Sequence, residues 1–148
     1  MRVPPGVWVG GAALAQWAMT RDRRHSRPST IAAALLGAAS GGLAVASAAR
    51  FLARSTTIDP ERVGRATTLV TDGANALTRN PMYLGLAGIL TAHALYRRSP
   101  TALLPMLAFV AVIDRWQIPA EEAALSENFG ASYDAYLHSV PRWLGPIR

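Results

Sequence analysis

Two short segments of this sequence combine residue types that could bind a charged ligand. One is Arg79-Asn80-Pro81-Met82-Tyr83-Leu84-Gly85, which stands directly in front of an apolar stretch. The other is the adjacent pair Glu121-Glu122 near the C-terminus. We interpret an arginine and an asparagine at the start of an apolar helix, facing two carboxylates, as a polar ligand site at the surface of a bilayer.

Asn80 and Pro81 are typical of the beginning of a helix. A residue before proline is biased toward extended geometry, and an asparagine there can cap the helix that follows. Pro81 is tolerated in the first turn, where its missing N–H costs little. The free N–H groups of that turn favour a carboxylate or a phosphate in front of them. Gly85 and Gly88 remove side chains from one flank, which allows either a flat ligand or another helix to approach.

The two glutamates cannot chelate one metal ion together, because adjacent helical residues point about 100° apart. Glu122 falls within an apolar stripe and Glu121 at its edge, and a buried carboxylate needs a cation or hydrogen-bond donors. Arg115 and Arg79 are candidate partners, although both could instead extend toward the headgroups. The alternative for the glutamates is a favourable charge at a helix N-terminus that begins at Pro119.

Stretches without any charged residue predict the elements that position these groups. Four such stretches have eighteen, twenty, seventeen and fifteen residues: Val3–Thr20, Thr30–Ala49, Asn80–Tyr96 and Ser99–Ile113. About 20 apolar residues cross a bilayer core, so the second stretch spans comfortably and the others need flanking residues. We therefore predict an all-α, polytopic membrane protein with about four transmembrane helices and a C-terminal amphipathic helix.

The order of these elements predicts that the two polar segments meet. The first two helices are expected at Pro5–Met19 and from Ser29 or Thr30, as the cap, to Leu52. A linker, Ala53–Arg79, leads to the third helix. The turn Arg97-Arg98-Ser99-Pro100 joins it to the fourth, which takes in Thr101 to about Trp116. Because helices three and four form an antiparallel hairpin, the linker and the C-terminal helix emerge on the same side, where Arg79-Asn80 can reach Glu121-Glu122.

The segment Pro119–Val140 has the pattern of an amphipathic helix. Its apolar and aromatic residues recur at spacings of four, four, three and four: Leu125, Phe129, Tyr133, Tyr136 and Val140. These residues fall on one helical face, so the helix is expected to lie near the interface. Gly130 is a candidate break or kink, and Trp143 is expected to anchor the end at the headgroups.

Composition excludes several kinds of chemistry. The sequence has no cysteine and no lysine, so thiolate and Schiff-base chemistry have no residue to use. The net charge of +6 is carried by arginines at helix boundaries. This indicates contact with membrane lipid headgroups, and it does not favour nucleic-acid binding. His25, His93 and His138 lie in separate segments and predict no metal site. The positive-inside rule gives no orientation, because arginines flank both ends of the helices.

Pairs of glycines four residues apart occur in the first two helices. They are Gly6 with Gly10 and Gly37 with Gly41. Small residues at this spacing let helix backbones approach closely in lipid, so we expect these glycines to be structural.

A longer series of segments carries a family resemblance. It consists of Leu69-Val70-Thr71-Asp72-Gly73, Arg79-Asn80-Pro81-Met82-Tyr83-Leu84-Gly85, Asp114-Arg115-Trp116-Gln117-Ile118-Pro119-Ala120-Glu121-Glu122, Leu125, Phe129-Gly130, Tyr133, Tyr136 and Val140-Pro141-Arg142-Trp143. In order and spacing these resemble the membrane methyltransferases of the isoprenylcysteine carboxyl methyltransferase and phosphatidylethanolamine N-methyltransferase superfamily. The match covers roughly Thr56 to the C-terminus, and the first two helices match only as generic spans. One departure is the run from Ala74 to Thr78, where relatives often have aromatic and basic residues.

The resemblance implies S-adenosylmethionine as the methyl donor, bound on the cytoplasmic side of a multi-pass membrane protein. It implies that Glu121 and Glu122 contact the cofactor's amino or ribose groups, and that these residues line its pocket: Arg79, Asn80, Pro81, Tyr83 and Gly85. Arg115 would orient an acidic acceptor or pair with a glutamate, and with Glu122 it is the candidate catalytic pair. Residues 1–148 would form one methyltransferase domain, with two N-terminal spans in 1–55 and the cofactor-binding core in 56–148.

The implied acceptor is lipophilic or a small amphiphile, and carboxyl, amine and thiol acceptors all occur in the superfamily. Two alternative functions involve no catalysis. One is a catalytically idle membrane scaffold that keeps the fold, and the other is a lipid-binding protein. The sequence predicts no oligomeric state.

Overall fold

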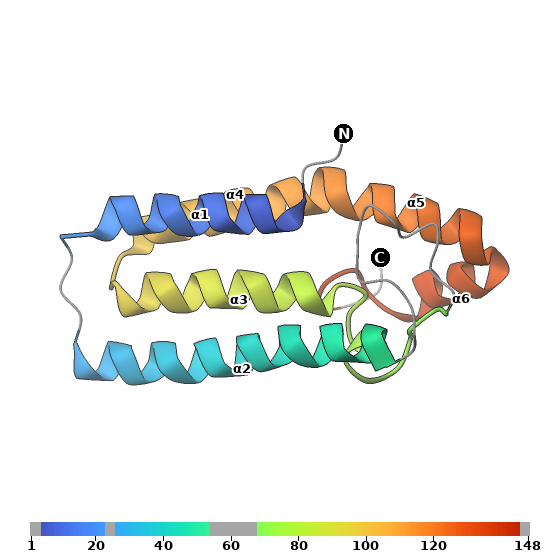
Figure 1. Cartoon of the computed structure of the whole chain (residues 1–148), viewed down its shortest axis with the longest axis horizontal. Helices are drawn as coiled ribbons and strands as arrows, with labels where there is room; N and C mark the ends of the chain where they lie inside the picture. Colours follow the sequence, from blue (N-terminus) through green and yellow to red (C-terminus); the bar gives the residue numbers. More distant parts are fainter. Residues whose placement is uncertain (1–3, 23–25, 54–67, 146–148) are drawn as a thin grey trace.

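The computed structural model describes residues 4–22, 26–53 and 68–145, and the regular secondary structure in this part of the chain is entirely helical, without strands (Figure 1). The all-α prediction is therefore confirmed. The α-helices are α1 (Pro5–Thr20), α2 (Arg27–Ala53), α3 (Pro81–Tyr96), α4 (Leu103–Val112), α5 (Ile118–Phe129) and α6 (Ala131–Ser139). Shorter elements are the 3₁₀ turns η2 (Gly73–Ala76) and η3 (Pro100–Ala102) and the π-helical turn η4 (Ile113–Gln117).

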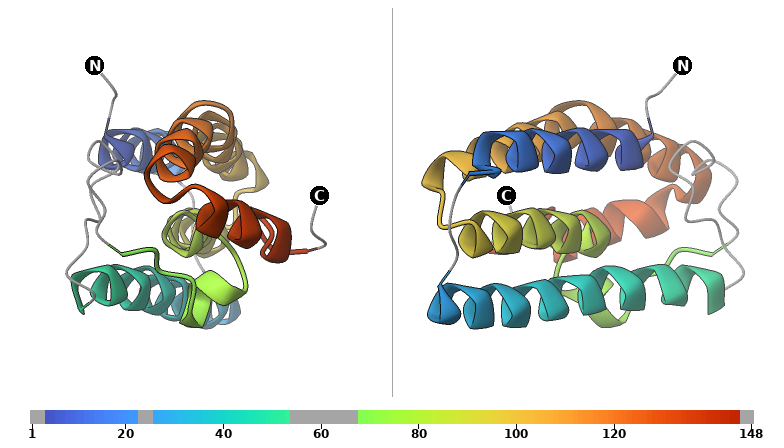
Figure 2. Two further views of the ribbon diagram at one scale, coloured as in Figure 1. Left: turned by 90° about the vertical axis from the view of Figure 1, so that its right-hand side faces the viewer. Right: turned by 60° about the vertical axis from the view of Figure 1, so that its left-hand side comes forward.

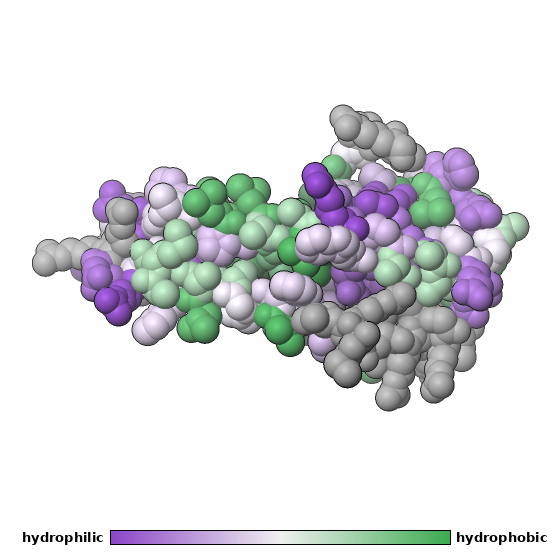
Figure 3. All heavy atoms as spheres, turned by 90° about the horizontal axis from the view of Figure 1, so that it is seen from above, coloured by the Kyte–Doolittle hydropathy of each residue, from purple (hydrophilic) through white to green (hydrophobic). Residues whose placement is uncertain are grey.

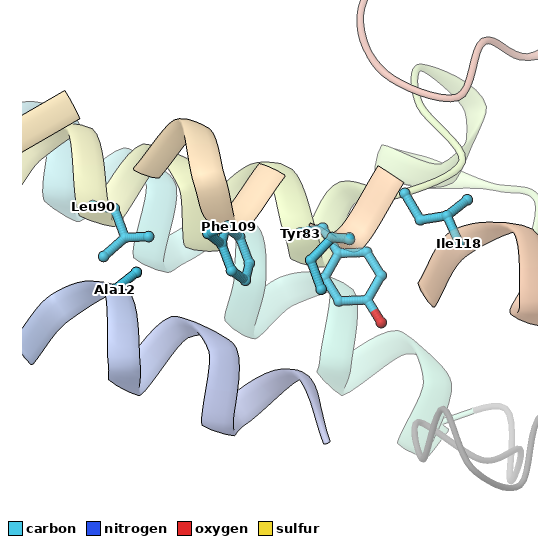
Figure 4. Packing of buried hydrophobic residues seen from close by; sticks show 6 residues of the cluster. Ala12, Tyr83, Leu90, Phe109 and Ile118 are labelled. Carbon is cyan, nitrogen blue, oxygen red and sulfur yellow. The ribbon is translucent and has the colours of Figure 1, made fainter. Parts of the chain in front are cut away.

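Helix α3 is the centre of a bundle. It packs along α2 on one side and against α1 and α4 on the other, and α1 also packs on α4 (Figures 1 and 2). A buried cluster that includes Ala12, Tyr83, Leu90 and Phe109 fills the space between α1, α3 and α4 (Figure 4). The predicted antiparallel hairpin of the third and fourth helices is present, with its turn at residues 97–100.

Glycines of α3 allow its close contact with α2. A Cβ atom on Gly85 would lie 2.7 Å from the Ser40 carbonyl oxygen and 2.9 Å from the Ala44 Cβ, and one on Gly88 would collide with the Ser40 side chain. On α2, a Cβ on Gly37 would touch Ala92 at 3.6 Å. The expected packing role is thus found for Gly37. At Gly6, Gly10 and Gly41 no described atom lies within 4 Å of such a Cβ, so a packing role for these three stays a prediction.

Buried polar side chains tie α1 to the hairpin at the end of the bundle remote from the C-terminal segment. The fully buried Gln16 donates from Nε2 to the Leu90 carbonyl at 2.9 Å and to the Ala102 carbonyl at 2.6 Å. Its Oε1 lies 3.0 Å from Nδ1 of His93. Arg97 donates to Thr20 at the end of α1. Because an unpaired amide in an apolar bundle is costly, these hydrogen bonds fix the position of α1.

Within the described residues, two helices are long and apolar enough to cross a membrane, α2 and the continuous helix Pro100–Phe129. Only 17% and 28% of their most apolar stretches are buried, whereas the core helix of a soluble protein would be mostly buried. Helices α1 and α3 have 16 residues each, or about 24 Å, which is less than the roughly 30 Å of the hydrocarbon core. The predicted count of four spans is therefore not confirmed. On the face seen in Figure 3, hydrophobic residues gather along the bundle and hydrophilic ones at its ends.

The predicted boundary between the fourth helix and the C-terminal helix is wrong, because α4 runs through η4 into α5. Pro119 lacks the N–H of a regular helix and its ring crowds the preceding turn, and the wider π-helical turn directly before it accommodates this. The break comes instead at Gly130, whose φ of +51° and ψ of −129° favour glycine. The residues of the predicted apolar stripe pack together although the helix is broken at Gly130. Tyr133, Tyr136 and Val140 form a buried cluster, and Leu125, Phe129 and Leu69 pack against it.

Two further predictions concern chain segments near α2. The cap of α2 is Ser26 rather than Ser29 or Thr30, since Ser26 Oγ accepts from the Ser29 N–H at 3.4 Å. Most of the predicted linker, residues 54–67, and His25 lie outside the described residues.

Candidate functional site

The predicted meeting of the two polar segments is present in the structure. Arg79 Nη2 donates to Glu122 Oε1 at 2.9 Å, and Arg79 and Glu122 are only 10% and 16% exposed. Arg79 also donates from Nη1 to the carbonyls of Leu137 at 3.1 Å and Val140 at 2.6 Å. One guanidinium therefore joins the start of α3 to α5, to the end of α6 and to the residue that follows α6.

A second arginine, Arg142, completes this charge cluster. Its Nη2 donates to Glu122 Oε2 at 2.5 Å and its Nε donates to Glu122 Oε1 at 3.2 Å. Its Nη1 lies 3.4 Å from Asp114 Oδ1. The hydrogen bond to Glu122 raises the pKa of the Arg142 guanidinium further above its usual range. Both oxygens of Glu122 are thus engaged by guanidinium groups.

Glu121 has a different environment from Glu122. Its Oε1 accepts hydrogen bonds from the Tyr83 hydroxyl at 2.6 Å and from Gln117 Nε2 at 2.7 Å. These two hydrogen bonds orient the carboxylate oxygen. Tyr83 belongs to α3 and Gln117 to the π-helical turn, and Glu121 therefore lies where these two elements meet.

Asn80 is in the cap position of α3, but its side chain does not act as the predicted cap. Asn80 Nδ2 instead donates to the Arg142 carbonyl at 3.0 Å, and the Thr78 hydroxyl donates to the same carbonyl at 2.9 Å. Pro81 is buried in the first turn. Among the described residues no side chain caps this helix, so the backbone N–H groups of Met82 and Tyr83 have no side-chain acceptor there.

The remaining predicted site residues are Gly85, which is packed against a helix, and Arg115, which is exposed. Gly85 lies against α2. The sequence left open whether a flat ligand or another helix approaches this glycine, and the structure shows another helix. Arg115 is exposed and forms no ion pair with any described residue. The expectation that Arg115 pairs with a glutamate is therefore wrong among the described residues. Arg142 forms an ion pair with Glu122 instead. A role for Arg115 in orienting an acceptor stays a prediction.

The C-terminal segment that carries Arg142 is fixed at several points. The Arg79 N–H donates to the Pro141 carbonyl at 2.9 Å. Trp143 Nε1 donates to Asp114 Oδ1 at 2.8 Å, and its ring packs against the core cluster. Trp143 is therefore fixed by Asp114 and by the core cluster, and its expected position at the headgroups stays a prediction.

Two buried tyrosines of α6 line the same region. Burial raises the pKa of the Tyr133 hydroxyl, and the charge of Glu122 adds to this effect. Burial also raises the pKa of the Tyr136 hydroxyl to about 12. Tyr136 donates to the Asn75 carbonyl at 2.6 Å, which joins α6 to η2. Both hydroxyls are therefore neutral hydrogen-bonding groups at physiological pH.

Sequence reasoning missed the roles of Gln117, Arg142 and Trp143. A signal was available for Gln117, since it lies four residues before Glu121, a spacing at which helical side chains meet. For the roles of Arg142 and Trp143, the only signal was their position in the segments that carry the family resemblance. Their contacts depend on the reversal at Gly130. The sequence marks Gly130 as a candidate break, but it does not predict the direction in which the chain turns there.

Comparisons with known proteins agree with the resemblance. The phospholipid methyltransferase family model matches residues 29–132. It extends into α2, which the motif resemblance did not cover, and it ends before the Val140–Trp143 segment. An uncharacterized protein of Haemophilus influenzae is 41% identical to this chain over 63 residues, which are 43% of this chain and 100% of the relative. No solved structure matches. Because the family model covers well over half of the sequence, the chain belongs to the phospholipid methyltransferase family, a family of membrane methyltransferases.

Proposed function

We propose that the protein is an integral membrane methyltransferase that uses S-adenosylmethionine and acts on a lipophilic or small amphiphilic acceptor. In this proposal the cofactor lies between the Arg79–Gly85 segment and the Glu121-Glu122 pair. The observation that carries it is the meeting of Tyr83 and Glu121, with 2.6 Å between the hydroxyl and the carboxylate. This contact brings the uncapped start of α3 next to an oriented carboxylate.

Those two groups have the chemistry to bind the amino-acid end of the cofactor. The N-terminus of a helix carries a partial positive charge and free N–H groups, which favour the cofactor's carboxylate. The Glu121 carboxylate favours its ammonium group or ribose hydroxyls. A negative charge near the bound cofactor also stabilises its sulfonium. The donor set of the site therefore fits S-adenosylmethionine.

The other site residues have supporting roles in this proposal. Glu122 with Arg79 and Arg142 holds α3, α5 and the C-terminal segment together, and Asn80 and Pro81 fix the start of α3. Gly85 keeps α3 close to α2. Arg115, exposed beside the site, remains the candidate for orienting an acidic acceptor at the membrane surface.

When bound, S-adenosylmethionine supplies a methyl group on a sulfonium, ready for direct displacement by a nucleophile. The protein's contribution to such a reaction is alignment, since proximity and orientation can supply much of the barrier reduction. Carboxyl, amine and thiol acceptors all remain open. We further propose that the site faces the cytoplasm, where the cofactor is made available.

A methyl-transfer assay tests this function. Membranes that contain the protein are incubated with S-adenosylmethionine labelled in its methyl group, and labelled lipids and small molecules are extracted and identified. The wild type and Glu127→Gln, an exposed carboxylate on the same helix, should label the same product, whereas Glu121→Gln should not. The idle-scaffold and lipid-binding alternatives predict no protein-dependent label in any of the three samples.

A further inference from the structure

The π-helical turn η4 has consequences for the carboxylate pair that follows it. The Ile118 N–H donates to the Ile113 carbonyl, five residues back, in place of the carbonyl four residues back. A turn of this kind shifts the register of the downstream helix by one residue, or about 100°. The direction in which Glu121 and Glu122 point is therefore set by η4.

Gln117 is the last residue of this turn and is only 6% exposed. It donates to the same Glu121 oxygen that Tyr83 contacts from α3. Two donors on different elements restrict one carboxylate oxygen to a single position. An exposed pair at this spacing would contribute little to helix stability. In a buried setting the loss of one donor changes where the carboxylate points.

We infer that Gln117 is a positioning residue for the proposed reaction, which holds Glu121 in the orientation that binds the cofactor's ammonium or ribose groups. The inference rests on the proposed function. The two adjacent glutamates differ in their contacts: Glu121 Oε1 accepts from Tyr83 and Gln117, whereas both oxygens of Glu122 accept from guanidinium groups. Gln117 itself does not touch the reacting atoms.

The test compares two buried glutamines in purified protein in detergent. Gln117→Met keeps the length of the side chain and removes its donor. Gln16→Met is the matched control, because Gln16 also makes buried amide hydrogen bonds but lies at the other end of the bundle. Calorimetric titration gives the Kd for S-adenosylmethionine, and thermal unfolding gives the Tm of each variant.

We expect Gln117→Met to weaken binding about tenfold, since one hydrogen bond to a charged group is lost, with little change in Tm. Gln16→Met should lower Tm and leave Kd within about twofold. In the methyl-transfer assay, Gln117→Met should raise KM for the cofactor while kcat at saturation changes less.

Three outcomes would overturn the inference. An unchanged Kd in Gln117→Met, with a wild type that binds, would leave the proposed function standing and remove the positioning role. A loss of affinity in both variants that follows their loss of Tm would show a purely structural role. A folded wild type that does not bind S-adenosylmethionine would overturn the proposed function itself, and the inference with it.

Discussion

Replacing Glu122 by glutamine should destabilise the protein more than any exposed substitution on the same helix. The carboxylate lies between Arg79 and Arg142, at 2.9 Å and 2.5 Å from their nearest nitrogens. Removing one partner of a buried ion pair costs about 3–5 kcal/mol, because the other charge stays buried. Arg79 is 10% exposed and keeps two carbonyl acceptors. A glutamine also retains one oxygen, so we expect about 2–3 kcal/mol.

Arg142 contributes less than Arg79 to the stability that is lost when Glu122 is replaced. Its side chain is 32% exposed, so solvent screens its attraction to Glu122. We expect Arg142→Gln to cost about 1 kcal/mol, at the upper end for partly exposed ion pairs. The double variant Glu122→Gln with Arg142→Gln should cost less than the sum of the two, because they share one interaction.

Tryptophan fluorescence during heating in detergent measures these effects, with Trp143 close to the cluster. For a chain of this size a loss of 2–3 kcal/mol corresponds to a decrease in Tm of about 5–10 °C. The matched control is Arg115→Gln, an exposed arginine of the same helix, which should change Tm by no more than about 2 °C. Equal Tm values for Glu122→Gln and Arg115→Gln would refute the conclusion that the charge cluster holds the C-terminal segment in place.

Substitutions at three further sites, with their controls, test separate contacts. Gly85→Ala places a Cβ 2.7 Å from the Ser40 carbonyl and should cost about 1–3 kcal/mol, whereas Gly10→Ala meets no described atom within 4 Å and should not lower Tm. Burial raises the pKa of Tyr136 from 10.0 to about 12, so its contribution to stability is complete below about pH 10 and is lost as the pH rises toward 12. Tyr136→Phe should therefore reduce the loss of Tm across that range, and an unaltered pH profile would contradict this. Asp114→Asn keeps an acceptor for Trp143 and should change Tm little, while Asp114→Leu should lower Tm and shift the tryptophan emission; equal effects would show that this hydrogen bond is not stabilising.

The sequence predicted the part of the site that depends on topology. Four charge-free stretches and a short turn implied a hairpin, and a hairpin returns the chain to the side where it began. The contact of Arg79 with Glu122 follows from that arrangement without any knowledge of distances. The stripe from Leu125 to Val140 was also predictable, because its members had to share a buried face.

The remaining features depend on local backbone geometry. Pro119 was an available signal, but a proline is compatible both with a new helix and with a helix that widens by one residue before it. The outcome depends on how the wider turn packs, which spacing does not encode. The position of Arg142 depends in turn on the reversal at Gly130. The sequence therefore suggested Arg115 beside Arg79 as a partner of the glutamates, although Arg115 is exposed and Arg142 is the second arginine at Glu122.

Calorimetric titration of S-adenosylmethionine into the purified protein tests the central claim most directly. We predict saturable binding by the wild type and by Glu127→Gln, and binding at least about tenfold weaker by Glu121→Gln, which loses a charge–charge contact with the ligand. All three proteins should have similar Tm values without the cofactor. A folded wild type that gives no saturable heat, or a Glu121→Gln variant that binds as tightly as the wild type, would contradict the account.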